Sequence, residues 1–203
     1  MAKKIFSIAI MAMVAVLVSA QDVTFGVKGG LNISEETNME HDPTDDMAFR
    51  MGFHVGGVAN FAIDDNWEVE ADLLYSMQGF KNKILLSEEQ NLDDANYTVT
   101  SHYLNLPIAL KFFPVEGLYV EGGPQVGYLL SKKDKLKGDD TGMSLYDSSA
   151  TKKLDFGVFA GLGYRFSNGI FVEGRYIHGL TGTSKLYDGS KNRNIQLSIG
   201  YLF

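Results

Sequence analysis

Four histidines, His41, His54, His102 and His178, are the side chains of this sequence best suited to proton transfer near neutral pH. Nucleophilic catalysis would need a histidine within reach of a serine or cysteine nucleophile. The chain has no cysteine, and Ser101 beside His102 is a two-residue coincidence of the kind that a lipid-active hydrolase could use. We therefore expect a protein that is not an enzyme and has no cofactor or metal site, with a lipid-active enzyme kept as an alternative.

A set of charged residues is more informative, because its members occupy alternate positions along the chain. The positions between them are apolar or small and carry no charge, apart from Arg193 at the start of the last segment. A period of two indicates strands with one oily face and one polar face. We predict that the charged residues form a network on the polar faces, namely Lys28, Arg50, Glu68, Glu70, Asp72, Lys111, Glu121, Asp155, Arg165, Glu173 and Arg175.

Eight segments carry this alternation. In the last one the oily positions include Ile195, Leu197 and Ile199, while Gln196 and Ser198 lie between them. The other seven segments cover residues 24–33, 49–61, 67–78, 104–112, 118–130, 154–166 and 170–180. Strands of this length match the roughly 9–11 residues that a tilted strand needs to cross a membrane.

The placement of charge distinguishes a membrane barrel from a soluble one. A soluble sandwich or a lipocalin-like carrier would bury its oily faces inward, but these faces are too large and too aromatic to share one small interior. A charged side chain that faces lipid at mid-membrane costs about 2–4 kcal/mol, which explains its absence from the oily faces. We predict an all-β fold: a transmembrane, eight-stranded, antiparallel up-and-down β-barrel of the size of OmpA and OmpX.

The connections alternate between long and short. The long ones cover about 34–47, 81–99, 131–152 and 181–192, and the short ones cover 64–66, 114–117 and 167–169. Outer-membrane barrels have short periplasmic turns and long extracellular loops. Pro107 and Pro124 fall inside predicted strands and cannot donate to a ladder, so we expect a bulge or a local water at each.

The N-terminus predicts export. Lys3 and Lys4 precede an apolar run from Ile5 to Val18, and small residues end at Ala20, so residues 1–20 are predicted to be a cleaved signal peptide and 21–203 the barrel domain. The alternative is a membrane anchor, but about 14 residues fall short of the roughly 20 that a helix needs. Removing two lysines leaves 16 basic against 25 acidic residues, which disfavours a nucleic-acid partner.

Several segments resemble a known family. TFGVKGGLNIS, YLNLPIALKFF, GLYVEGGPQVGYLLS and the final YLF are similar to the PorT-type family of bacterial outer membrane protein beta-barrel domains. The resemblance implies a barrel in the outer membrane of a Gram-negative cell and supplies no catalytic residues. Tyr201 and Phe203 resemble the C-terminal signal that the barrel-assembly machinery recognises, which makes that machinery a predicted partner. The namesake of the family is linked to protein secretion.

The lumen and the loops give the functional expectations. An eight-stranded barrel is just wide enough to fill with side chains, so we expect an ion-paired plug, with a narrow ion path as the alternative. Lys111 and Glu121 would form one such pair. The long loops are oppositely charged: the first is acidic, and the third holds Lys132, Lys133, Lys135, Lys137, Lys152 and Lys153.

We expect these loops to be solvated. The acids of the first loop could instead bind a divalent cation, and the lysines of the third could contact lipopolysaccharide phosphates or a partner. The predicted function is a structural or interaction role through extracellular loops, with outer-membrane lipid, lipopolysaccharide and an extracellular or envelope protein as partners. A small porin or a component of a secretion apparatus is the alternative.

Overall fold

The computed structural model describes residues 23–37, 49–84, 95–136, 152–182 and 191–203. The predicted signal peptide, most of the acidic first loop and Lys137 lie outside these ranges. Eight strands form within them: β1 (Val23–Thr37), β2 (Arg50–Ala62), β3 (Trp67–Ile84), β4 (Ala95–Val115), β5 (Leu118–Leu136), β6 (Leu154–Arg165), β7 (Ile170–Gly182) and β8 (Lys191–Leu202). No helix among the described residues is long and apolar enough to cross a membrane.

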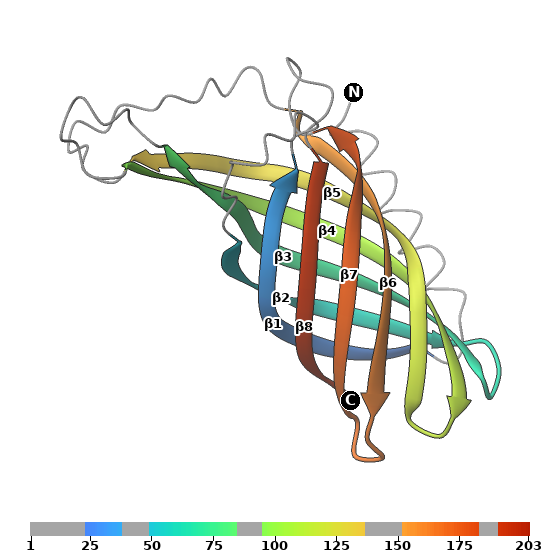
Figure 1. Ribbon diagram of the computed structural model, residues 1–203. Coiled ribbons are helices and arrows are strands. Elements are labelled where there is room, and N and C mark those ends of the chain that lie inside the picture. The colour runs from blue at the N-terminus through green and yellow to red at the C-terminus, as the bar shows by residue number, and fades with distance from the viewer. Residues whose placement is uncertain (1–22, 38–48, 85–94, 137–151, 183–190) are drawn as a thin grey trace, which may run out of the picture.

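The strands form one closed antiparallel barrel (Figure 1). Each strand pairs with the next along the chain, and β8 returns to pair with β1 from Leu202–Gly26 to Lys191–Thr37. Beyond the last strand, the Phe203 amide donates to the Phe25 carbonyl at 2.9 Å. Closure leaves no free edge along the barrel wall, as a membrane-spanning sheet requires. The predicted eight-stranded antiparallel barrel is confirmed.

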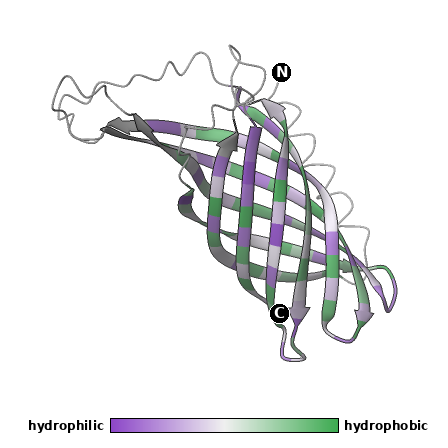
Figure 2. Ribbon diagram, viewed as in Figure 1, coloured by the Kyte–Doolittle hydropathy of each residue, from purple (hydrophilic) through white to green (hydrophobic). Residues whose placement is uncertain are grey.

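Oily side chains face outward and polar ones inward. Along β8, Leu197 and Ile199 are 53% and 60% exposed, whereas Gln196 between its oily neighbours is 1% exposed. Figure 2 shows the same alternation of hydrophobic and hydrophilic residues along the other strands. Some residues depart from this pattern. Leu106, placed by its parity on the oily face, is only 3% exposed, and Leu74, Tyr119 and Phe171 are large apolar side chains buried at inward positions.

The short turns lie together at one end of the barrel. Between β2 and β3, the Asp64 carboxylate accepts hydrogen bonds from the amides of Asn66 and Trp67, both at 2.8 Å. The turns between β4 and β5 and between β6 and β7 contain Gly117 and Gly169, whose φ angles of +79° and +87° disfavour any residue with a Cβ. The sequence placed all three turns correctly to within two residues.

Three strands extend six or more residues beyond the ends that the sequence predicts. The sequence pattern predicts loops for residues 81–84, 95–99 and 131–136, but these residues belong to β3, β4 and β5. The pairing of β2 with β3 stops at His54–Ser76, and that of β5 with β6 stops at Tyr128–Leu154. The three strands therefore continue past their neighbours as a sheet of their own (Figure 1). The positions that continue the outward parity of β3 and β4 into this sheet, such as Gly79, Thr98 and Thr100, are not oily, so the pattern that predicts the other strands does not continue there.

The two strand prolines cause no bulge, so of the two predicted outcomes only a local water stays a prediction. Pro107 lies opposite Gln125, and Pro124 lies opposite Val158. The pairing of β3 with β4 runs from Ala71–Ile108 to Leu74–Asn105 without a change of register. The register shifts between β4 and β5 lie elsewhere, between His102 and Tyr103 and between Phe112 and Val115. A proline removes one ladder hydrogen bond, and here the strands tolerate that loss without an extra residue.

Candidate functional site

The lumen contains the charged residues that the alternation singled out. Seven of them form a central cluster from five strands, each no more than 6% exposed: Lys28, Glu70, Asp72, Lys111, Glu121, Glu173 and Arg175. Glu68 and Arg165 pair separately, nearer the short turns. The two remaining residues join neither group: the Arg50 guanidinium donates to the Gln78 and Val99 carbonyls, and the Asp155 carboxylate accepts from Thr181 and Asn192.

Arg175 is the centre of the cluster. Its Nη1 lies 2.7 Å from the Asp72 carboxylate, its Nη2 lies 2.9 Å from Glu70, and its Nε lies 2.6 Å from Glu121. The guanidinium carbon also lies 4.9 Å from the centre of the Phe159 ring. Arg175 therefore joins β7 to β3 and β5 across the lumen, although β7 is not a neighbour of either strand in the barrel wall. A planar guanidinium with five donors suits this role better than an ammonium.

Two lysines complete the cluster. The Lys28 ammonium contacts Asp72 at 2.6 Å and Glu173 at 2.7 Å. The Lys111 ammonium contacts Glu70 and lies 4.4 Å from the centre of the Tyr119 ring. Lys111 also lies opposite Glu121 in the β4–β5 pairing, with 3.9 Å between the charged atoms. The predicted Lys111–Glu121 pair is present in this register.

Charge in the cluster is nearly balanced. Three cations face four carboxylates, and the Tyr119 hydroxyl donates to Glu173 at 3.0 Å. Buried charges are tolerated only when each is paired and hydrogen-bonded, because their desolvation is costly. One carboxylate oxygen, Asp72 Oδ1, has no hydrogen-bond partner among the described residues. Oxygens of Glu70, Glu121 and Glu173 lie within 4.8 Å of one another, as in a metal site, but each of these carboxylates already contacts a lysine or Arg175.

A second buried layer is polar but carries no carboxylate or ammonium. His54 lies between the Asn32 amide oxygen and the Ser198 hydroxyl, with 2.9 Å from a ring nitrogen to each. Asn32 also donates to Ser76 at 2.9 Å and accepts from Gln196 at 3.1 Å. The sequence placed His54, Gln196 and Ser198 on polar faces but did not single them out. Their shared inward parity was the available signal.

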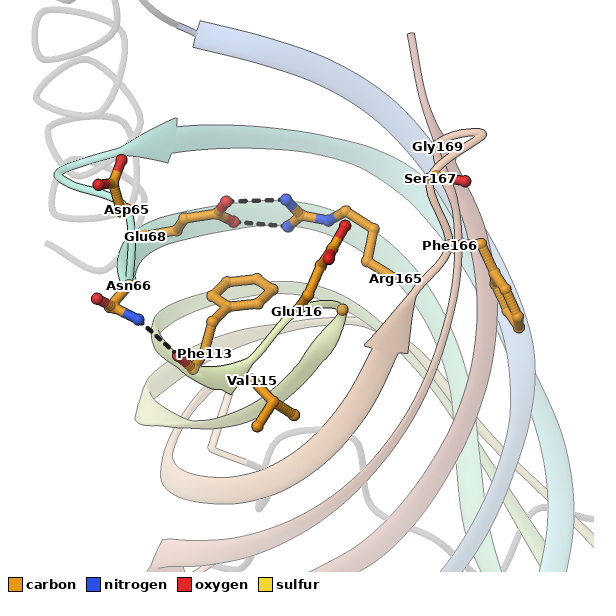
Figure 3. A pocket seen from close by; sticks show the side chains of 11 residues that line it. Asp65, Asn66, Glu68, Phe113, Val115, Glu116, Arg165, Phe166, Ser167 and Gly169 are labelled. Atoms are coloured by element: carbon orange, nitrogen blue, oxygen red, sulfur yellow. Dashed lines mark hydrogen bonds and ion pairs between the residues drawn. The ribbon is translucent and has the colours of Figure 1, made fainter.

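The lumen opens at the short turns into a cavity of about 520 Å³ (Figure 3). Glu68 and Arg165 face each other across its inner wall, with the two hydrogen bonds at 2.8 and 2.6 Å. The Phe113 ring lies 5.0 Å from the Arg165 guanidinium carbon, beside this pair. The cavity ends at the ion pair and the aromatic ring, so it is a mouth of the lumen.

Comparison with known proteins identifies this barrel. The sequence model of the family described as outer membrane protein beta-barrel domain matches residues 19–185. The chain belongs to this family. Its place in the cell is therefore the outer membrane, and the oily belt of the barrel faces hydrocarbon. No curated protein matches this outer-membrane barrel in sequence.

A solved structure has the same fold. Neisserial surface protein A has 11% sequence identity to this outer-membrane barrel and a TM-score of 0.56, and the match covers 90% of this chain and 100% of that one. The attachment invasion locus protein Ail of Yersinia pestis has 16% sequence identity and a TM-score of 0.45, with the same coverage. OprG of Pseudomonas aeruginosa has 14% sequence identity and a TM-score of 0.46, and the match covers 91% of this chain and 97% of that one. At these identities the likeness concerns the fold alone.

Proposed function

We propose that this protein is an outer-membrane barrel with a closed, side-chain-filled lumen, which serves a structural or interaction role through the end that carries its long connections. One observation carries the proposal: seven charged side chains from opposite walls meet at the centre of the lumen and are bonded to one another. A passing ion would have to separate these pairs. Separating buried pairs is costly, because each charge would be left without its partner.

The orientation is part of the proposal. The three short turns lie in the periplasm and the long connections lie outside the cell, as in other barrels of this kind. Export through a signal peptide at residues 1–20 and recognition of Tyr201 and Phe203 by the barrel-assembly machinery accord with this arrangement. The partner of the outer end is an extracellular or envelope protein, or lipid, and the protein has no enzymatic activity of its own.

Resemblance to PorT-type proteins brings the second candidate. The segments YLNLPIALKFF and GLYVEGGPQVGYLLS support a PorT-type member of the family. A component of a protein-secretion apparatus would need partners in the membrane or periplasm, and co-purification from mild detergent would reveal them. A small porin would need no partner, because its lumen would itself conduct.

Planar-bilayer recording tests the closed lumen. Refolded wild-type protein should give no stepwise conductance, although heat-modifiable migration on a gel shows that it is folded. The Glu70→Gln variant, which changes charge at the centre, and Leu197→Val, which changes only the lipid-facing surface, should be equally silent. Steady wild-type conductance that changes in Glu70→Gln but not in Leu197→Val would contradict the plug and favour the small porin.

A further inference from the structure

The sheet that continues past the barrel rim is rich in lysine. We define the outer extension as residues 77–84 of β3, 95–102 of β4 and 129–136 of β5. It contains five lysines and one acid, Asp134, in a chain whose net charge is −7. The lysines are Lys81, Lys83, Lys132, Lys133 and Lys135. A segment of this composition attracts anions.

The base of the extension lies at the membrane interface. Met77, His102 and Ser131 face one another across β3, β4 and β5. The Tyr75 hydroxyl hydrogen-bonds to His102 Nδ1 at 2.7 Å, and the Tyr75 ring lies 5.8 Å from that of Phe53. Aromatic side chains with a polar tip gather where hydrocarbon meets headgroups. This row therefore marks the outer boundary of the oily band.

Lysines occupy the rows directly above that boundary. The next row with the same parity is Gly79–Thr100–Lys133, and the one after it contains Lys81, Thr98 and Lys135. Residues directly opposite each other in an antiparallel sheet share a face. Two residues of a strand tilted by about 45° rise roughly 5 Å along the membrane normal. The lysine rows thus lie roughly 5 and 10 Å above the boundary, in the zone of lipid headgroups.

The neighbouring wall supports this placement. Leu130 is an exposed apolar residue at the lipid-facing surface, and Lys133, three residues later, is exposed as well. Beside them the Leu129 amide donates to the Lys153 carbonyl at 2.8 Å, which brings exposed Lys153 next to β5. The change from apolar to basic side chains therefore occurs over a few residues on β5 and directly before the start of β6, as it does where a protein surface leaves hydrocarbon.

The opposite end of the barrel has the opposite charge. In the described short turns, residues 63–66, 116–117 and 166–169, the charged residues are Asp64, Asp65 and Glu116, all exposed. The charge asymmetry therefore follows the barrel axis. A soluble polyanion could bind lysines anywhere on the outer end of the protein. An anionic lipid headgroup meets lysines that lie directly above the lipid-facing surface, which is where these rows lie.

We propose that the outer extension binds the phosphate groups of a phosphorylated glycolipid in the outer leaflet. This inference rests on the orientation proposed above, with the extension on the outer side. Ammonium groups above the oily band pair with the phosphates while the acyl chains lie along the apolar wall below. The glycolipid then stabilises the three-stranded extension, whose two outer strands have no ladder partner in β2 or β6 at this level.

Binding to purified lipopolysaccharide tests the proposal. The full mature barrel, refolded in neutral detergent, is titrated with lipopolysaccharide and with the same material after removal of its phosphates. Dephosphorylation should weaken binding at least tenfold. The triple variant Lys81→Gln/Lys133→Gln/Lys135→Gln should lose about 100-fold, and the corresponding lysine-to-arginine triple variant should bind as the wild type does. Lys191→Gln, on the opposite wall at the outer end, is the matched control and should change little.

Three outcomes would overturn the inference. They are equal binding of the dephosphorylated glycolipid, an unchanged affinity of the glutamine variant, and preferential binding of a soluble sulfated polysaccharide over the glycolipid. Heat-modifiable migration confirms that each variant is folded. Failure of the orientation is separable, because binding in detergent does not depend on it. Labelling of a cysteine introduced at Lys133 or Glu116 in intact cells reports which end is outside.

Discussion

β3, β4 and β5 each pass through two environments, and their sequences change accordingly. Within the barrel their charges point inward, as Glu70, Lys111 and Glu121 do, and their outward positions are oily. Beyond the rim the same strands lose the oily alternation and carry lysines at register positions that continue the outward surface. The backbone is the same antiparallel ladder in both parts, so the difference comes from what surrounds it.

This contrast shows how strictly each environment selects side chains. Hydrocarbon excludes charge from the outer face of the barrel, and the narrow lumen accepts charge only in bonded pairs. The extension meets headgroups and water and accepts single charges. Substitutions should therefore have large effects in the lumen, somewhat smaller ones on the lipid-facing wall, and slight ones on the extension.

The largest effect is expected from Arg175→Met. The substitution leaves four buried carboxylates with only two lysines, and breaking a buried pair costs about 3–5 kcal/mol. The free energy of unfolding, measured by urea titration in lipid vesicles, should fall by this amount. Arg175→Lys should recover part of the loss, because it restores the charge without the fork of donors. A loss below about 1 kcal/mol for Arg175→Met would mean that the central cluster contributes little to the fold.

A matched pair on β4 compares the wall with the extension. Leu110 is 46% exposed on the lipid-facing side, level with the central cluster, and Leu110→Arg should cost about 2–4 kcal/mol in vesicles. Thr100→Arg, ten residues earlier on the extension, should stay within about 0.5 kcal/mol, as for a surface position. The same urea titration measures both. Equal losses of unfolding free energy for the two variants would contradict an outer boundary of the oily band near His102.

A smaller effect is expected at the turn-side mouth. The side chains of Arg165 and Glu68 are 21% and 14% exposed, so water partly compensates for the loss of either partner. Arg165→Gln should cost about 1 kcal/mol, well below Arg175→Met. The double variant with Glu68→Gln should lose less than the two single losses combined, since the pair is then removed as a unit. Strict additivity would show that the bidentate contact is unimportant in solution.

The sequence predicted the barrel well because the membrane imposes a simple pattern. The alternation at Ile195–Phe203 and in seven other segments predicts the number of strands and which of their side chains face outward. Short turns with a glycine, such as Gly117, predict where the strands end. Long-range contacts were harder to predict. Nothing in the sequence shows that Arg175 reaches Asp72 across the lumen while Asp155 bonds to Thr181 and Asn192, because that depends on strand stagger and side-chain length.

The sequence pattern does not predict the outer extension. Residues 131–136 are polar, and the apolar residues Ala95, Tyr97 and Val99 have the opposite parity to the oily positions of β4. The sequence pattern therefore assigns both segments to loops, although they pair as strands. For the strand prolines, the sequence predicts an irregularity that the strand pairing does not show. Pro107 suggested an extra residue, yet the pairing around it keeps its register. Propensity alone does not report what the neighbouring strands tolerate.

The most direct test uses Trp67, the single tryptophan of the chain, which is 38% exposed on the outer face with its ring 4.7 Å from that of Phe112. In vesicles, lipids brominated near the headgroup should quench its fluorescence strongly, and aqueous acrylamide should quench it weakly. Two double variants replace this tryptophan by one at a neighbouring position. In Trp67→Phe/Phe112→Trp the new tryptophan should be quenched as Trp67 is. In Trp67→Phe/Phe113→Trp it faces inward and should be shielded from the brominated lipid. Quenching of Trp67 by acrylamide but not by brominated lipid would contradict an oily face turned toward hydrocarbon.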